Sequence, residues 1–238
     1  MAPEVQRGDV EVASARTRPR NGLANHSLSI AASFLFLLFI LGQALAGFSV
    51  YNDDLRQHGQ LPIAFLAYLQ CSHFLEATFE NWESEFLQMG MYVLLTVKLY
   101  QKGSSESKTR GEPHSSDEDP RLHRAEPGAP WPVRKGGLFL RLYEHSLSIA
   151  LLGLFLATFA GHALSGVGRL NEERLEHGES PMSVQEYLTS ANFWFESLQN
   201  WQSEFLAVLA IVSFTIFLRQ RGSPQSKPVA APHWETDG

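Results

Sequence analysis

Two copies of one short polar motif could hold a cation or a proton at the edge of an apolar stretch. Residues 81–85 read Asn-Trp-Glu-Ser-Glu and residues 200–204 read Asn-Trp-Gln-Ser-Glu, and an apolar run follows each motif at once. A carboxylate at the centre of a bilayer costs about 2.5–3.5 kcal/mol on insertion scales. We therefore expect the last glutamate of each motif to face the interior of a helical bundle or water.

The predicted polar site gathers the motif residues that lie near those two glutamates on a helix. Each glutamate follows an asparagine by four positions, so the two side chains share one helix face. The predicted site residues are Asn81, Ser84, Glu85, Asn200, Ser203 and Glu204. The alternative is structural, because the same side-chain types also fix helix packing through hydrogen bonds between helices.

A second set of residues could bind a metal ion. His73, Glu76 and Glu80 fall at positions i, i+3 and i+7 of one helix face. Histidine and carboxylate side chains are the metal ligands of helical bundles, but the paired Glu-x-x-His spacing of those sites is missing. A solvated helix face is therefore the interpretation that we favour over a metal site.

The two motifs belong to a longer internal repeat. Residues 26–31 read His-Ser-Leu-Ser-Ile-Ala and recur at 145–150, and both pairs of segments lie about 119 residues apart. Between residues 23 and 108, roughly 35 of about 86 positions are identical at this offset, far more than chance gives. The sequence therefore predicts a tandem duplication.

The apolar segments predict membrane spans. Residues 27–50 and 145–167 are almost wholly apolar and exceed the roughly 20 residues that cross a bilayer. Residues 86–100 and 205–218 are shorter and reach crossing length only if the polar motifs enter the membrane. The predicted fold is an all-α membrane protein with four transmembrane helices, arranged as two parallel tandem repeats of a two-helix unit.

Charge predicts the orientation and the domain boundaries. Of the 19 lysine and arginine residues, all but Arg56, Arg169 and Arg174 lie in or next to the N-terminal arm, the central linker and the tail. The positive-inside rule places these segments in the cytoplasm. The polar composition of these segments predicts disorder. The predicted parts are a disordered arm (1–22), a first repeat (23–101), a disordered linker (102–138), a second repeat (139–220) and a disordered tail (221–238).

The connections between the spans leave alternatives open. Residues 63–80 and 182–199 are either amphipathic helices in the membrane interface or extensions of the second spans. Asn52 and Asn171 each precede two acidic residues, which is typical of a helix N-cap, so each is expected to start a short outer helix that a glycine ends.

Several classes of function are excluded or disfavoured. The net charge is −6 and no basic stripe with interleaved aromatic residues occurs, so we expect no nucleic-acid partner. The single cysteine, Cys71, cannot form an intrachain disulfide. Gly-x-Ser-x-Gly, a glycine-rich phosphate loop and His-Glu-x-x-His are all missing from the sequence. We therefore expect no enzymatic activity and no cofactor.

The polar motif and its flanks carry a resemblance to a known family. Residues 74–88 and 200–207 resemble a family of uncharacterised bacterial inner-membrane proteins, and the similarity extends over most of the chain. The resemblance implies a multi-pass protein of the bacterial cytoplasmic membrane and supplies no activity or ligand.

Two functions remain as hypotheses. The first is a small cation or proton channel or transporter that uses Glu85 and Glu204. The second is a non-catalytic membrane scaffold whose cytoplasmic linker binds a protein partner. A membrane metalloenzyme built on His73, Glu76 and Glu80 is the hypothesis that we favour least.

Overall fold

The structure is a computed structural model that describes residues 22–236. The chain divides into two compact units, one ending at Val50 and the other beginning at Tyr51, and each is described by itself. All regular secondary structure among the described residues is helical, so the predicted all-α class is confirmed. The predicted arm, residues 1–22, lies outside the described residues except for Gly22.

The first unit consists of α1 (Gly22–Asn25) and most of α2 (Ser27–Gln57). At 1.5 Å per residue, the 31 residues of α2 extend over about 46 Å, more than the thickness of a bilayer core. Large apolar side chains such as Phe34 and Phe39 are exposed along it. A helix that is apolar on all sides suits a lipid environment.

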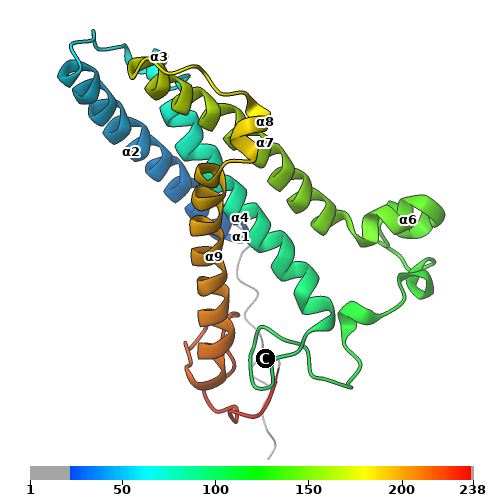
Figure 1. Ribbon diagram of the computed structural model, residues 1–238. Helices are drawn as coiled ribbons and strands as arrows, with labels where there is room; N and C mark the ends of the chain where they lie inside the picture. The colour runs from blue at the N-terminus through cyan, green and yellow to red at the C-terminus, as the bar shows by residue number, and fades with distance from the viewer. Residues whose placement is uncertain (1–21, 237–238) are drawn as a thin grey trace, which may run out of the picture. The chain divides into compact units, whose positions relative to one another are not determined.

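The second unit is organised around α4, which lies alongside both α7 and α9 (Figure 1). Its helices, in chain order after the last turns of α2, are α3 (Phe65–Tyr68), α4 (Ser72–Lys98), η1 (Ser115–Asp117), η2 (Pro120–His123), α5 (Trp131–Lys135), α6 (Gly137–Glu144), α7 (Ser146–Glu176), α8 (Val184–Leu188) and α9 (Ala191–Phe217). The contact between α4 and α7 is the most extensive in the unit.

The segments of intermediate hydropathy divide into two parts. Residues 72–80 and 191–199 continue α4 and α9, whereas α3 and α8 are separate short helices. Ser183 and Glu186 form a capping box at the start of α8, and Ser190 caps α9 through the backbone N–H of Phe193. These caps fix the break between the short helix and the long one.

Asn52 and Asn171 do not start new helices, which corrects the N-cap prediction. Both lie inside long helices, and their side-chain amides bind the backbone of the following loop. Asn171 accepts from the backbone N–H of Met182 at 2.6 Å and donates to its carbonyl at 2.9 Å, and Asn52 binds Ile63 in the same way at 2.7 and 3.2 Å. Helices α2 and α7 therefore continue until the turns at Gly59 and Gly178, both of which have a positive φ.

Within residues 22–236, three helices are long and apolar enough to cross a membrane: α2, α7 and α9. Helix α4 is as long as α9, at 27 residues, but carries four glutamates in its first half. Both bounds of α7 and of α9 lie about 119 residues after those of α2 and α4, the offset of the sequence repeat.

The start of the linker contacts both α9 and the tail. Ser104 Oγ lies 2.8 Å from Thr215 Oγ1, and the backbone N–H of Gly103 donates to Thr236 Oγ1 at 2.9 Å. Residues 102–138 form turns, two short 3-10 helices, α5 and the first two residues of α6. Disorder of the linker and tail in solution stays a prediction.

Candidate functional site

One face of α4 is unusually acidic and is turned toward α7 and α9. Glu76, Glu80 and Glu83 are spaced at i, i+4 and i+7, so they share this face. Glu83 is completely buried, Glu76 is 5% exposed and Glu80 is half-buried. On α7, His162 and Arg169 are also seven residues apart and face the carboxylates. The packing of α4 on α7 therefore brings opposite charges together in the interior.

Glu83 and His162 form the buried centre of the site. His162 Nδ1 lies 2.9 Å from Glu83 Oε2, and both side chains are fully buried. The other carboxylate oxygen, Glu83 Oε1, accepts a hydrogen bond from Trp201 Nε1 of α9 at 2.9 Å. One carboxylate oxygen of Glu83 thus contacts a side chain of α7, and the other accepts a hydrogen bond from a side chain of α9.

Arg169 and Tyr187 organise the end of the site near α8. Arg169 forms an ion pair with Glu76, and its Nη2 lies 3.6 Å from Glu196 Oε1. The hydroxyl of Tyr187 donates to Glu196 Oε2 at 2.9 Å. Burial and the hydrogen bond to Glu196 raise the pKa of Tyr187, so its hydroxyl stays protonated and remains a donor.

We call this set the buried polar cluster. It consists of the α4 carboxylates and the side chains of α7, α8 and α9 that bind or face them: Glu76, Glu80, Glu83, His162, Arg169, Tyr187, Glu196, Asn200 and Trp201. An apolar group that joins α7, α8 and α9 supports it beside Tyr187: Ala163, Val167 and Phe193. The ring of Phe193 lies 4.9 Å from that of His162, centroid to centroid, and 5.3 Å from that of Tyr187.

The cluster holds more acid than base. Its four glutamates face a single guanidinium and a single imidazole, so it carries a negative excess unless protons or cations balance it. Buried charges without a partner are costly, and buried carboxylates respond by taking up a proton or a cation. One atom is available to such a partner, because Glu76 Oε1 is buried without a hydrogen bond to any described residue. His162 Nε2 lies 3.7 Å from Glu196 Oε2.

A cavity of about 510 Å³ reaches the cluster from the ends of α2 and α7. We call it the vestibule. Arg169 belongs to both the vestibule wall and the cluster, and His73 lies on the same wall. The rest of the lining is rich in acidic side chains and histidine: Tyr51, Asp54, Leu55, His58, Gln60, Glu172, Glu173, Glu176 and His177.

The structure places five of the six residues of the predicted polar site outside the buried polar cluster. Glu85 is exposed, and Glu204 is half-buried within electrostatic range of it. Asn81 is exposed and donates to the carbonyl of Ala77, whereas Ser84 is buried and donates to the carbonyl of Asn81. Ser203 is exposed and donates to the carbonyl of Asn200. Asn200 alone of the predicted set belongs to the cluster, through its 2.5 Å hydrogen bond to Glu80.

The proposed metal ligands have different partners. Glu76 pairs with Arg169, Glu80 accepts from Asn200, and His73 Nδ1 lies 3.1 Å from the hydroxyl of Tyr68. Across the part of the chain that the structure describes, no group of three or more histidine, cysteine, aspartate or glutamate residues has the arrangement of a metal site. The structure therefore does not gather His73, Glu76 and Glu80 into a ligand set.

The fold and the site define a class of protein. The described chain is all-helical, and its three long apolar helices are those of a multi-pass membrane protein. The chain belongs to the family described as Domain of unknown function (DUF6766), whose model matches residues 19–238. No curated protein and no solved structure matches the chain.

Proposed function

We propose that α4 is a fourth membrane span and that the chain is built from two parallel two-helix repeats. Glu76, Glu80 and Glu83 lower the apolar character of α4, but they lie against α7 and α9. The fourth carboxylate of α4, Glu85, is exposed. Ionisable residues inside membranes are tolerated where they face the bundle interior and find partners. The common 119-residue offset of the helix bounds supports the correspondence of α2 with α7 and of α4 with α9 as two copies of one unit.

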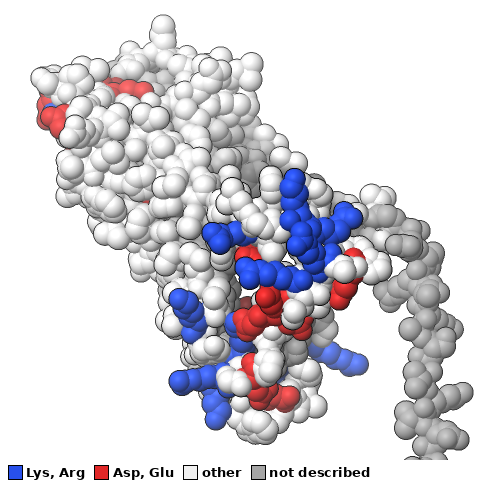
Figure 2. All heavy atoms as spheres, turned by 90° about the vertical axis from the view of Figure 1, so that its right-hand side faces the viewer, with Lys and Arg blue, Asp and Glu red and all other residues white. Residues whose placement is uncertain are grey.

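The proposed orientation places both termini and the linker in the cytoplasm of a bacterial inner membrane. The linker holds many of the chain's lysine and arginine residues, and the positive-inside rule assigns such segments to the cytoplasmic side. On the face drawn in Figure 2, lysine and arginine side chains gather in one region, and a broad neighbouring region is almost without charge. The vestibule then opens to the outside.

The proposed function is cation or proton transport through the buried polar cluster. The observation that carries it is the excess of carboxylates around the fully buried pair of Glu83 and His162. A protonatable chain of carboxylate and imidazole groups inside a membrane is typical of proton relays. The vestibule gives the cluster access to solvent on the proposed outer side, and its acidic lining attracts cations.

Flux across liposomes tests this proposal. Purified protein is reconstituted, and a proton gradient or a sodium or potassium gradient is imposed and followed with an ion-sensitive dye. We expect flux with the parent protein and none above empty liposomes with Glu83→Gln, because the amide cannot exchange a proton with His162. Glutamine has nearly the same shape as glutamate, so the variant should fold. The midpoint of thermal unfolding of the variant protein shows whether it does. Glu76→Gln is the second variant if it does not.

The matched control is the double variant Glu85→Gln/Glu204→Gln, which removes the two carboxylates that the sequence alone favours. We expect it to keep the flux of the parent, because Glu85 is exposed and neither residue belongs to the cluster. Loss of flux in the control with flux retained in Glu83→Gln would contradict the cluster as the pathway. Absence of flux in the parent would contradict transport and favour the scaffold hypothesis.

A further inference from the structure

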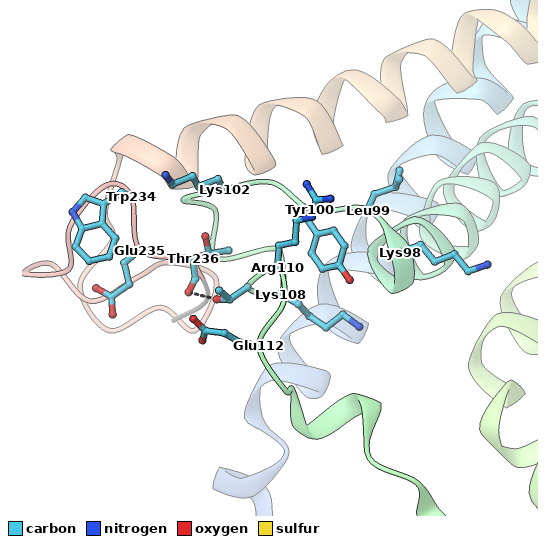
Figure 3. A pocket seen from close by; sticks show the side chains of 11 residues that line it. Lys98, Leu99, Tyr100, Lys102, Lys108, Arg110, Glu112, Trp234, Glu235 and Thr236 are labelled. Atoms are coloured by element: carbon cyan, nitrogen blue, oxygen red, sulfur yellow. Dashed lines mark hydrogen bonds between the residues drawn. The ribbon is translucent and has the colours of Figure 1, made fainter.

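Figure 3 shows a second cavity, of about 860 Å³. It lies at the end of α4 that is away from the vestibule. Three segments form it: the end of α4, the start of the linker and the tail. Two hydrogen bonds to Thr236 close the tail over the linker, from the backbone N–H of Gly103 at 2.9 Å and from Thr109 Oγ1 at 3.2 Å. Its volume falls in the range of pockets that hold small molecules.

The lining of this cavity is rich in cationic side chains. Lys98, Lys102, Lys108 and Arg110 contribute to it, against two acidic residues, Glu112 and Glu235. Lys108 is engaged with Asp117 at 2.7 Å. The side chains of the other three basic residues make no hydrogen bond or ion pair to any residue between 22 and 236.

The matching segment of the second copy lacks this arrangement. At the 119-residue offset Lys98 corresponds to Phe217, and Arg110 corresponds to Val229. Lys227, which corresponds to Lys108, is buried and donates to the carbonyls of Pro232, His233 and Glu235. The unpaired cationic groups of this cavity are therefore found together in the first copy, and the repeated segment does not by itself produce them.

We propose that this cavity binds a phosphate-bearing anion through Lys98, Lys102 and Arg110. Ammonium groups bind phosphate as point charges, and a guanidinium binds it with two parallel hydrogen bonds. The indole of Trp234 and the ring of Tyr100 line the same cavity and offer apolar surface to the rest of the ligand. The phosphate belongs either to a lipid headgroup, since Lys98 is the last residue of α4, or to a soluble phosphate compound.

Two probes distinguish these sources. Purified full-length protein in nanodiscs of phosphatidylcholine is titrated with pyrophosphate by calorimetry, which tests the soluble source. Nanodiscs with a minor fraction of phosphatidic acid, analysed for lipid retained on extraction, test the lipid source. The variant Lys98→Gln/Lys102→Gln/Arg110→Gln is compared with Arg121→Gln/Arg141→Gln/Arg221→Gln, which removes the same charge at exposed positions outside the cavity.

We expect the cavity variant to bind one of the two probes at least about tenfold more weakly than the parent, because each charge-assisted hydrogen bond contributes strongly to affinity. The control variant should bind like the parent. The probe that responds identifies the source of the phosphate. Equal binding by both variants, or no binding of either probe to the parent, would overturn the proposal.

Discussion

Glu83→Ala should destabilise the folded protein by about 3–5 kcal/mol, the typical cost of removing one partner from a buried charged pair. The change leaves His162 Nδ1 and Trp201 Nε1 without their acceptor, and the His162 side chain is fully buried. Part of the cost is the buried polar groups left unpaired, and part is the cavity. Thermal or denaturant unfolding in detergent, monitored by circular dichroism, measures it.

The chain offers a matched control for this change. Gln202 occupies the position that corresponds to Glu83 at the 119-residue offset, but it is exposed. Gln202→Ala should therefore change stability by less than about 0.5 kcal/mol, as is usual for surface substitutions. If the two substitutions changed the free energy of unfolding by similar amounts, the placement of Glu83 in the interior against α7 and α9 would be contradicted.

Gly166→Ala should also destabilise the protein, by about 1–3 kcal/mol, because it overpacks a rigid contact. A Cβ at Gly166 would lie 2.8 Å from Cζ of the Tyr187 ring, closer than real Cβ contacts. Tyr187 cannot easily withdraw, since it is fully buried and α8 is fixed by its capping box. The displaced ring would also move its hydroxyl away from Glu196.

Gly153→Ala on the same helix is the control for the glycine substitution. A Cβ at Gly153 meets nothing within 4 Å. Alanine is a better helix former than glycine by roughly 1 kcal/mol, so this change should be neutral or stabilising. A difference of sign between the two substitutions in the same unfolding assay is the expected result. Equal stabilisation would contradict the close approach of α7 and α8.

Helix positions were largely predictable from the sequence, because apolar length and the repeated pattern both report on them. The span predicted at 27–50 lies within α2, and the span predicted at 145–167 lies within α7 except for its first residue, His145. The apolar ends of α4 and α9 were also predicted. The site was harder, since Glu83 and Glu85 are two positions apart and so point to different sides of one helix. Which of the two glutamates is buried depends on the side of α4 against which the neighbouring helices pack. The sequence of the motif alone does not show which side that is.

The strongest signal in the sequence for the site was the set of charged residues that differ between the two copies, not the residues that the copies share. At the 119-residue offset, His162 corresponds to Gln43, Arg169 to Val50 and Glu196 to Ala77. The charged groups of the cluster thus occur in one copy only, at positions that a search for shared residues passes over. Tyr187 and Trp201 correspond to Tyr68 and Trp82, so identity between the copies points to these two cluster residues.

The central claim is that α4 crosses the membrane with Glu76, Glu80 and Glu83 packed against α7 and α9. Labelling of two single cysteines tests the crossing most directly. Cys71 immediately precedes α4, and Ser115 follows it in the linker and is exposed. The parent protein, with Cys71 alone, is compared with Cys71→Ser/Ser115→Cys on intact cells, using a membrane-impermeant maleimide.

Because burial raises the pKa of the Cys71 thiol and the thiolate is the reacting form, labelling is run at about pH 8.5, where the reaction is faster than at neutral pH. Solubilised protein provides the full labelling value for each cysteine. We predict that Cys71 reacts on intact cells and that the cysteine at position 115 reacts only after lysis, since α4 separates them. Labelling of both from the same side would contradict α4 as a membrane span.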